Sequence, residues 1–219
     1  MKRAFTLAEV LVSVFLFGTV MAMVLGILFP SLFMFKAESA RSDAQQSAML
    51  LTTRLQRALL NSATEWVTLA SDPMAVSYRE VNPNSPYDPG SGAARWQPSF
   101  QIVRYDAARR KVYEKAWPPA PPSTSDSSLQ QNYDFSHPTL SKLTIADLVL
   151  ICQHPYDKER TLADHVESFI VTDQDGDITM LQPPLKISAV CSVANNGQGR
   201  QTVERYRLDV SVTPRCQRW

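Results

Sequence analysis

The sequence is short of glycine, cysteine and net charge, and each shortage argues against a class of function. It has 7 Gly against 15 Pro, and no glycine-rich loop of the kind that binds phosphate is present. The three cysteines, Cys152, Cys191 and Cys216, form no Cys-x-x-Cys pair, so there is no zinc or thioredoxin-type motif. The formal net charge is +1, which gives no sign of a protein specialised for nucleic acids. We therefore expect no cofactor and no nucleic-acid partner.

Motifs of catalytic sites are also missing, including the nucleophile elbow, the zinc-protease helix motif and the P-loop. Of His137, His154 and His165, only His154 has a cysteine close by in the sequence. On a strand, Cys152 and His154 would face the same side. A structural metal usually needs four ligands, however, and no second pair is near. We expect a structural protein rather than an enzyme; a secreted enzyme with an unrecognised site is an alternative.

Three acids at alternate positions, Asp173, Asp175 and Asp177, form a weak calcium candidate. Calcium binds several carboxylates on a tight turn, but the EF-hand glycine and final glutamate are not present. The alternative is a polar hairpin turn, for which the Asp-Gly pair at 175–176 is the signal. The basic cluster Arg109–Lys111 is similarly typical of a solvated hairpin tip rather than of a nucleic-acid contact.

A long apolar run near the N-terminus is the strongest feature that is present. From Phe5 to Phe35 the only charged residue is Glu9, and Lys2 and Arg3 precede the run. The run exceeds the ~20 residues that a helix needs to cross a bilayer. Basic residues before it place the N-terminus in the cytoplasm by the positive-inside rule. We expect a single-pass inner-membrane protein whose chain is exported after Lys36.

Three interpretations of this segment compete. The first is a cleavable secretory signal, since Val20-Met21-Ala22 satisfies the small-x-small rule. The acid within the run and the apolar residues beyond Ala22 count against it. The second is a plain membrane anchor, which explains the length of the run but not Glu9. The third explains both features and depends on the residues around Phe5.

The stretch KRA-FTLAEV resembles the leader and cleavage site of type IV pilins and pseudopilins. The resemblance implies that a prepilin peptidase removes residues 1–4 by cutting between Ala4 and Phe5, and that Phe5 is then N-methylated. Ala4 stands where the family usually has glycine. Glu9 becomes the fifth residue of the mature chain, where the family's glutamate acts in assembly. Pairing with the terminal amine of a neighbouring subunit would neutralise a charge that is costly inside a membrane.

The same resemblance implies the partners and the function. The partners are a prepilin peptidase, other pilin or pseudopilin subunits and an inner-membrane assembly platform. The protein would be a minor pilin or pseudopilin subunit of a type IV pilus or a type II secretion pseudopilus, and DNA uptake is a further setting. The alternative is a membrane-anchored binding or adhesive head that uses the helix as a simple tether.

The helix should continue beyond the membrane segment of residues 5–35 into an amphipathic helix over residues 36–61. Apolar residues recur there at steps of three and four on one face: Ala40, Ala44, Ala48, Leu51, Leu55 and Leu59. A helix from about Phe5 to about Leu60 spans on the order of 80 Å. We expect Pro30 to kink or locally melt it, and Gly18 and Gly26 to loosen it.

Residues 62–219 have the pattern of a β-sheet region, which with helix 36–61 forms an exported head of residues 36–219. The expected strands are Glu65–Leu69, Ala75–Glu80, Phe100–Tyr105, Lys111–Lys115, Asp147–Cys152, Val166–Thr172, Leu185–Val193 and Val203–Val212. No helical pattern separates them, so the sheet should be antiparallel. Loops rich in proline and serine interrupt the strands at 81–92 and 117–131. The fold class is α+β, a pilin-like long helix against an antiparallel sheet.

The last third of the chain has a second resemblance. The segments HVESFIVTDQDG, PPLKISAVCSV and VERYRLDVSVTP follow one another in an order similar to that of J-type minor pseudopilins and W-type minor pilins. All three cysteines lie in this third. In an exported head at most one intramolecular disulfide can form among Cys152, Cys191 and Cys216, and it would staple one sheet. The sequence does not select the pair.

Overall fold

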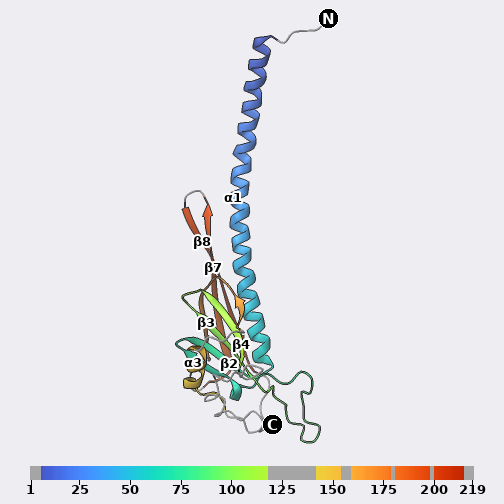
Figure 1. The fold of residues 1–219 in the computed structure, drawn as a ribbon, viewed down its shortest axis with the longest axis vertical. Helices are drawn as coiled ribbons and strands as arrows, with labels where there is room; N and C mark the ends of the chain where they lie inside the picture. The colour runs from blue at the N-terminus through green and yellow to red at the C-terminus, as the bar shows by residue number, and fades with distance from the viewer. Residues whose placement is uncertain (1–5, 118–141, 154–158, 179–180, 198–199, 215–219) are drawn as a thin grey trace.

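A computed structural model describes residues 6–117, 142–153, 159–178, 181–197 and 200–214. These residues form a long N-terminal helix and two antiparallel sheets, which confirms the expected α+β, pilin-like arrangement (Figure 1). The N-terminal part of the helix stands clear of the sheets, and its C-terminal part lies along them. The helix therefore joins an isolated apolar segment to a packed head.

Helix α1 runs from Leu7 to Leu60. Its 54 residues extend about 80 Å at ~1.5 Å per residue. At its C-terminus the backbone N–H of Asn61 donates to the carbonyls of Arg57 and Ala58 at 3.2 and 3.1 Å. The expected end of the helix is confirmed. Phe5, its expected start, lies outside the described residues.

Pro30 does not interrupt α1, and the local melting expected there is wrong. A proline within a helix removes the single hydrogen bond that its own nitrogen would donate. The hydroxyl of Ser31 adds a bond in the same turn, to the carbonyl of Ile27 at 2.8 Å. The apolar run and the head are therefore connected by one continuous element.

The larger sheet has five strands in the order β1-β2-β3-β4-β5, and every pairing is antiparallel. The strands are β1 (Thr68–Ser71), β2 (Met74–Tyr78), β3 (Phe100–Asp106), β4 (Lys111–Trp117) and β5 (Arg160–Ala163). The expected strands at 75–80, 100–105 and 111–115 are confirmed to within a few residues. A 3₁₀ turn, η1 (Thr64–Trp66), replaces the start of the first expected strand. Strand β5 had no counterpart among the expected strands.

The smaller sheet has the order β6-β7-β8 and is also antiparallel. Its strands are β6 (Val166–Thr172), β7 (Leu185–Gly197) and β8 (Arg200–Val212), close to the expected positions. The β7–β8 hairpin extends beyond the other strands alongside α1 (Figure 1). Ala40, Ala44 and Ala48 are buried on the part of α1 that packs against this sheet.

Residues 147–152 are helical, so the strand expected at Asp147–Cys152 is wrong. They belong to helix α3 (Ile145–Gln153). The hydroxyl oxygen of Thr144 accepts from the backbone N–H of Asp147 at 3.2 Å and caps the helix. The buried residues Leu148, Ile151 and Cys152 fall at steps of three and four, which is helical spacing. A short apolar run fits either a buried strand or a buried helix, and here the cap favours the helix.

Two apolar clusters lie on opposite faces of the five-stranded sheet. The first joins the C-terminal half of α1 to this sheet and to the smaller sheet. The second lies between the five-stranded sheet, α3 and η1. Successive residues of one strand belong to different clusters; Val76 faces α1 and Ala75 faces α3. All six residues of the expected stripe on α1 are buried, which confirms it.

Candidate functional site

The start of α1 is built around Glu9, the single acid of the apolar run. The hydroxyl oxygen of Thr6 accepts from the backbone N–H of Glu9 at 3.4 Å. In return, Glu9 Oε2 accepts from the backbone N–H and the hydroxyl of Thr6, both at 3.0 Å. This is a capping box, which satisfies donors that the start of a helix leaves unpaired. Its sequence signal is Thr-x-x-Glu at 6–9, which locates the helix start at Leu7.

The capping box leaves part of the Glu9 carboxylate available. Both of its bonds end on Oε2, and Oε1 accepts no hydrogen bond from the described part of the chain. An ionised carboxylate offers about four lone-pair sites. Glu9 is also exposed. A cation that arrives from another molecule can therefore bind Oε1 without displacing Thr6. The expected cleavage site, Ala4 and Phe5, lies outside the described residues.

The large apolar side chains of α1 are exposed along most of its length from Leu7 to Phe35. Among the described residues, α1 alone is long and apolar enough to cross a membrane. Its most apolar 18-residue window has a mean hydropathy of 2.5, and none of that window is buried. Such a surface requires lipid or another apolar surface to cover it. The arrangement fits a single-pass membrane protein.

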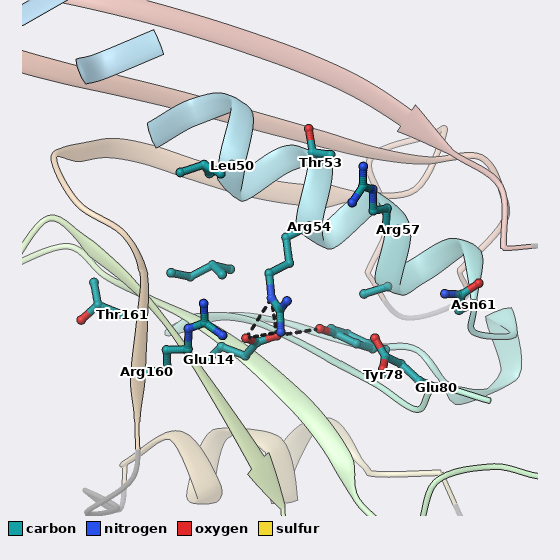
Figure 2. A pocket seen from close by; sticks show the side chains of 12 residues that line it. Leu50, Thr53, Arg54, Arg57, Asn61, Tyr78, Glu80, Glu114, Arg160 and Thr161 are labelled. Carbon is teal, nitrogen blue, oxygen red and sulfur yellow. Dashed lines mark hydrogen bonds and ion pairs between the residues drawn. The ribbon is translucent and has the colours of Figure 1, made fainter. Parts of the chain in front are cut away.

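A groove of about 360 Å³ lies beside the C-terminal half of α1, where the helix passes the five-stranded sheet (Figure 2). Arg57 of α1 and Arg160 of β5 stand on its two walls, and Leu50 and Leu162 supply apolar surface. Figure 2 shows Glu114 beneath the helix, at the centre of a polar network. We call this feature the α1–β5 groove.

The floor of the groove is a fully hydrogen-bonded network. Arg54 Nε lies 3.2 and 3.0 Å from the two carboxylate oxygens of Glu114, and its Nη2 lies 2.9 Å from Oε2. The Tyr78 hydroxyl donates to Glu114 Oε1 at 3.3 Å. Burial raises the pKa of Tyr78 well above its ordinary value. Burial, followed by the charge of Glu114, raises the pKa of Glu80. No sequence signal joins Arg54 to Glu114, which are 60 residues apart.

The two arginines on the walls of the groove, Arg57 and Arg160, differ from Arg54 in their partners. Arg57 and Arg160 are exposed. Neither has an ion-pair or hydrogen-bond partner for its side chain within the described ranges, whereas Arg54 is bound to Glu114. Arg57 also lies in the last turn of α1, where a cation interacts favourably with the helix dipole.

The acidic stretch at 173–177 is a turn that its first residue organises. Asp173 is buried, and its Oδ1 accepts from the backbone N–H groups of Asp175 and Asp177 at 2.9 and 2.7 Å. Its Oδ2 accepts from Gln182 N at 3.4 Å. Gly176 has a φ of 86°, which favours glycine. The polar Asp-Gly turn is confirmed, and the described residues hold no cluster of three metal-ligating side chains.

The cysteines and histidines are separated by the fold. Cys152 lies on α3 and not on a strand, so a bridge from it would not staple one sheet as expected. Cys152 and Cys191 are both free and buried, in different apolar clusters. Burial raises the pKa of each thiol to about 11. Cys216, His137 and His154 lie outside the described residues.

The basic cluster Arg109–Lys111 forms the turn between β3 and β4, as expected. The carbonyl of Arg110 accepts from the backbone N–H of Val166 at 2.8 Å, and its guanidinium donates to the Ser192 hydroxyl. Lys111 pairs with Asp164 at 2.8 Å. The contacts of Arg110 tie the turn to β6 and β7 of the smaller sheet.

A family model of the prokaryotic N-terminal methylation motif matches residues 1–25. No curated protein and no solved structure matches the chain. The motif implies a pilin-like protein that prepilin peptidase processes and that assembles with other pilins. It also suggests a structural protein rather than an enzyme.

Proposed function

We propose that this protein is a minor pilin or pseudopilin, a structural subunit of a type IV pilus or a type II secretion pseudopilus. Prepilin peptidase cuts it between Ala4 and Phe5, and the new N-terminal Phe5 is methylated. The N-terminus lies in the cytoplasm, and the head is exported. One observation supports this most directly: α1 is continuous, with an exposed apolar half that bears Glu9 and a second half that is packed into the head.

Glu9 is the assembly residue in this proposal. Its Oε1 is available to a cation from another molecule, and the methylated amine of a neighbouring Phe5 is such a cation. Unpaired charges are unfavourable within a membrane, so a neighbour that neutralises both groups is preferred over one that is out of register. The order of β6, the Asp-Gly turn and the β7–β8 hairpin supports the J-type or W-type minor subunits in particular.

The cleavage step is tested by mass spectrometry of the protein extracted from membranes. We expect an N-terminus at methylated Phe5. A mature chain that starts at Met23 would establish a secretory signal instead. An intact Met1 in cells with active prepilin peptidase would leave only a membrane anchor.

The assembly step is tested with Glu9→Gln, which keeps the shape of the side chain and removes its charge. We expect normal abundance, normal cleavage and a folded head, with loss of incorporation into the fibre or tip complex. Glu38→Gln, a change at an exposed position of the same helix outside the apolar run, is the matched control and should assemble normally. If Glu9→Gln is incorporated as the unchanged protein is, Glu9 is not the assembly residue and merely lies at the membrane interface.

A further inference from the structure

The α1–β5 groove has an uneven distribution of charge. Its floor holds the carboxylates of Glu80 and Glu114, and Arg54 is already bound to Glu114. Its walls hold Arg57 and Arg160, for which the described residues supply no counter-ion. Cations without partners at the edge of a hollow favour an anionic ligand. The carboxylates of the floor keep that anion at the edge.

The size of the groove limits what can enter it. A volume of about 360 Å³ equals roughly a dozen water molecules at ~30 Å³ each. An α-helix with its side chains is about 10–12 Å wide, so a neighbouring helix would lie over the hollow rather than enter it. The hollow can hold a few side chains from the tip of a loop. The groove therefore fits a loop better than a helix of a neighbouring molecule.

The surface beside the groove is apolar and belongs to α1. A second, shallower hollow follows the helix from Ser42 to Arg57 and shares Leu50, Thr53 and Arg57 with the groove. Met49 and Leu50 are 44% and 58% exposed on this face. Arg, Met and Tyr are enriched where proteins bind one another. A protein loop can contact this apolar strip and the two arginines at once, whereas a small free anion can contact only the arginines.

We propose that the α1–β5 groove receives an acidic loop from the head of a neighbouring subunit in the assembled fibre. An aspartate or glutamate of that loop binds Arg57 or Arg160 at the edge of the groove, and apolar residues beside it cover Leu50. The contact joins two different surfaces, and heterologous contacts of this kind generate an open helical filament when the rotation between neighbours does not close a ring. This inference rests on the proposed function and adds a contact of the heads to the contact of Glu9 within the membrane.

The first test is site-specific photo-cross-linking in cells that assemble the fibre. The full-length protein carries p-benzoylphenylalanine at Thr53, within the groove, or at Ile170, an exposed position on the smaller sheet. We expect Thr53 to capture a subunit, and sequencing of the linked peptide should place an acidic residue beside the linked position. A linked peptide from a neighbour's N-terminal helix, or one without an acid, would overturn the proposal.

The second test removes the two charges. Arg57→Gln with Arg160→Gln should lower the yield of the Thr53 cross-link about tenfold or more, and Arg57→Lys with Arg160→Lys should retain most of it. Arg41→Glu, at an exposed position of α1 outside the groove, is the control and should leave the yield unchanged. Thermal melting in detergent checks that each variant is folded. An unchanged yield in the glutamine variant rules out the arginines as the anchors.

The outcomes separate this inference from the proposed function. Cleavage at Phe5 and incorporation into the fibre, without a Thr53 cross-link, would exclude the groove contact and leave the subunit role intact. A protein that is neither cleaved nor incorporated would exclude both. Incorporation that depends on Glu9, together with a cross-link that depends on Arg57 and Arg160, would support both.

Discussion

Individual leucines of α1 show how strongly the head depends on this helix. Leu51, Leu55 and Leu59 have no exposed surface, and they belong to the cluster that joins α1 to both sheets. Leu50, next to Leu51, points to the other side and is 58% exposed. The same residue type therefore has a structural role at one position and is available for contact at the next.

Leu55→Ala should destabilise the head by about 2–5 kcal/mol, because it removes buried apolar surface and leaves a cavity. Urea unfolding of the full-length protein in detergent, followed by tryptophan fluorescence, measures the change. Leu50→Ala is the control on the same helix and should change the free energy of unfolding by only about 0.5 kcal/mol or less. Equal effects of the two changes would contradict the packing described for α1.

The ionisation of Glu159 should change the stability of the folded protein measurably. Arg104 Nε and Nη2 donate to its two oxygens at 3.1 and 2.7 Å, and Lys115 Nζ lies 3.3 Å from Oε1. Burial opposes its ionisation, but the hydrogen bond from Arg104 and the charge of Lys115 outweigh burial and lower its pKa. The unfolded chain then binds this proton more readily than the folded one.

The contribution of the Glu159 carboxylate to the free energy of unfolding should therefore be fully present above the ordinary glutamate pKa of about 4.3. This contribution should be lost as the pH falls through the lowered pKa of Glu159. Glu159→Gln should melt at a lower temperature at neutral pH, and the difference from the unchanged protein should shrink on acidification. Thermal melts across this pH range test it. Glu38→Gln provides the exposed control. A difference that does not vary with pH would contradict the ion-pair assignment.

At the scale of elements, the fold depends on a few polar contacts between segments that are far apart in the chain. Lys115 of β4 donates to the carbonyl of Ile151 at 2.7 Å and so holds the last turn of α3. Tyr105 of β3 donates to the carbonyl of Glu167 at 2.7 Å and joins the two sheets. The Arg54–Glu114 pair connects α1 to β4 of the larger sheet.

Glu114→Gln should lower stability by about 1.5–3 kcal/mol, the range for hydrogen bonds to charged groups, because Arg54 and Tyr78 then face a neutral amide with one acceptor oxygen in place of a carboxylate. The free energy of unfolding in detergent measures it. Asp88→Asn, which removes the exposed partner of Arg95 on the loop at 81–92, is the control and should leave the melting temperature nearly unchanged. If both variants melt alike, the floor network does not fasten α1 to the sheet.

The whole molecule divides at the point where α1 meets the head. Between Leu7 and Phe35 the large apolar side chains are mostly exposed, whereas Ala40 to Leu59 supply one wall of the core. The helix is continuous, but its two halves are stabilised by different surroundings: lipid or neighbouring subunits for the first, and the protein's own sheets for the second.

A chain that starts at Lys36 should therefore fold and melt cooperatively in water, because it retains the buried stripe of α1. A chain that starts at Ser62 should show no cooperative melt, since Leu51, Leu55 and Leu59 are absent from its core. Circular dichroism on heating distinguishes the two. A cooperative melt of the shorter chain would show that the sheets form a core without α1.

The parts of this protein that follow a local pattern could be read from the sequence. The apolar run, the steps of three and four from Ala40 to Leu59, and the motif around Phe5 depend only on neighbours along the chain. These patterns predicted the helix, its buried face and the methylation motif. The Thr-x-x-Glu cap at Thr6 depends equally on neighbours along the chain.

Other features depended on which segments meet in space. The apolar run at 147–152 suits a strand or a helix, and its place opposite Trp117 and Phe100, together with the Thr144 cap, decides for the helix. The pairing of Arg54 with Glu114, and the placement of Arg57 and Arg160 on the walls of one groove, depend on residues from distant segments. The pattern of residues along the chain does not predict such contacts, because they depend on which faces of the strands and helices pack against one another.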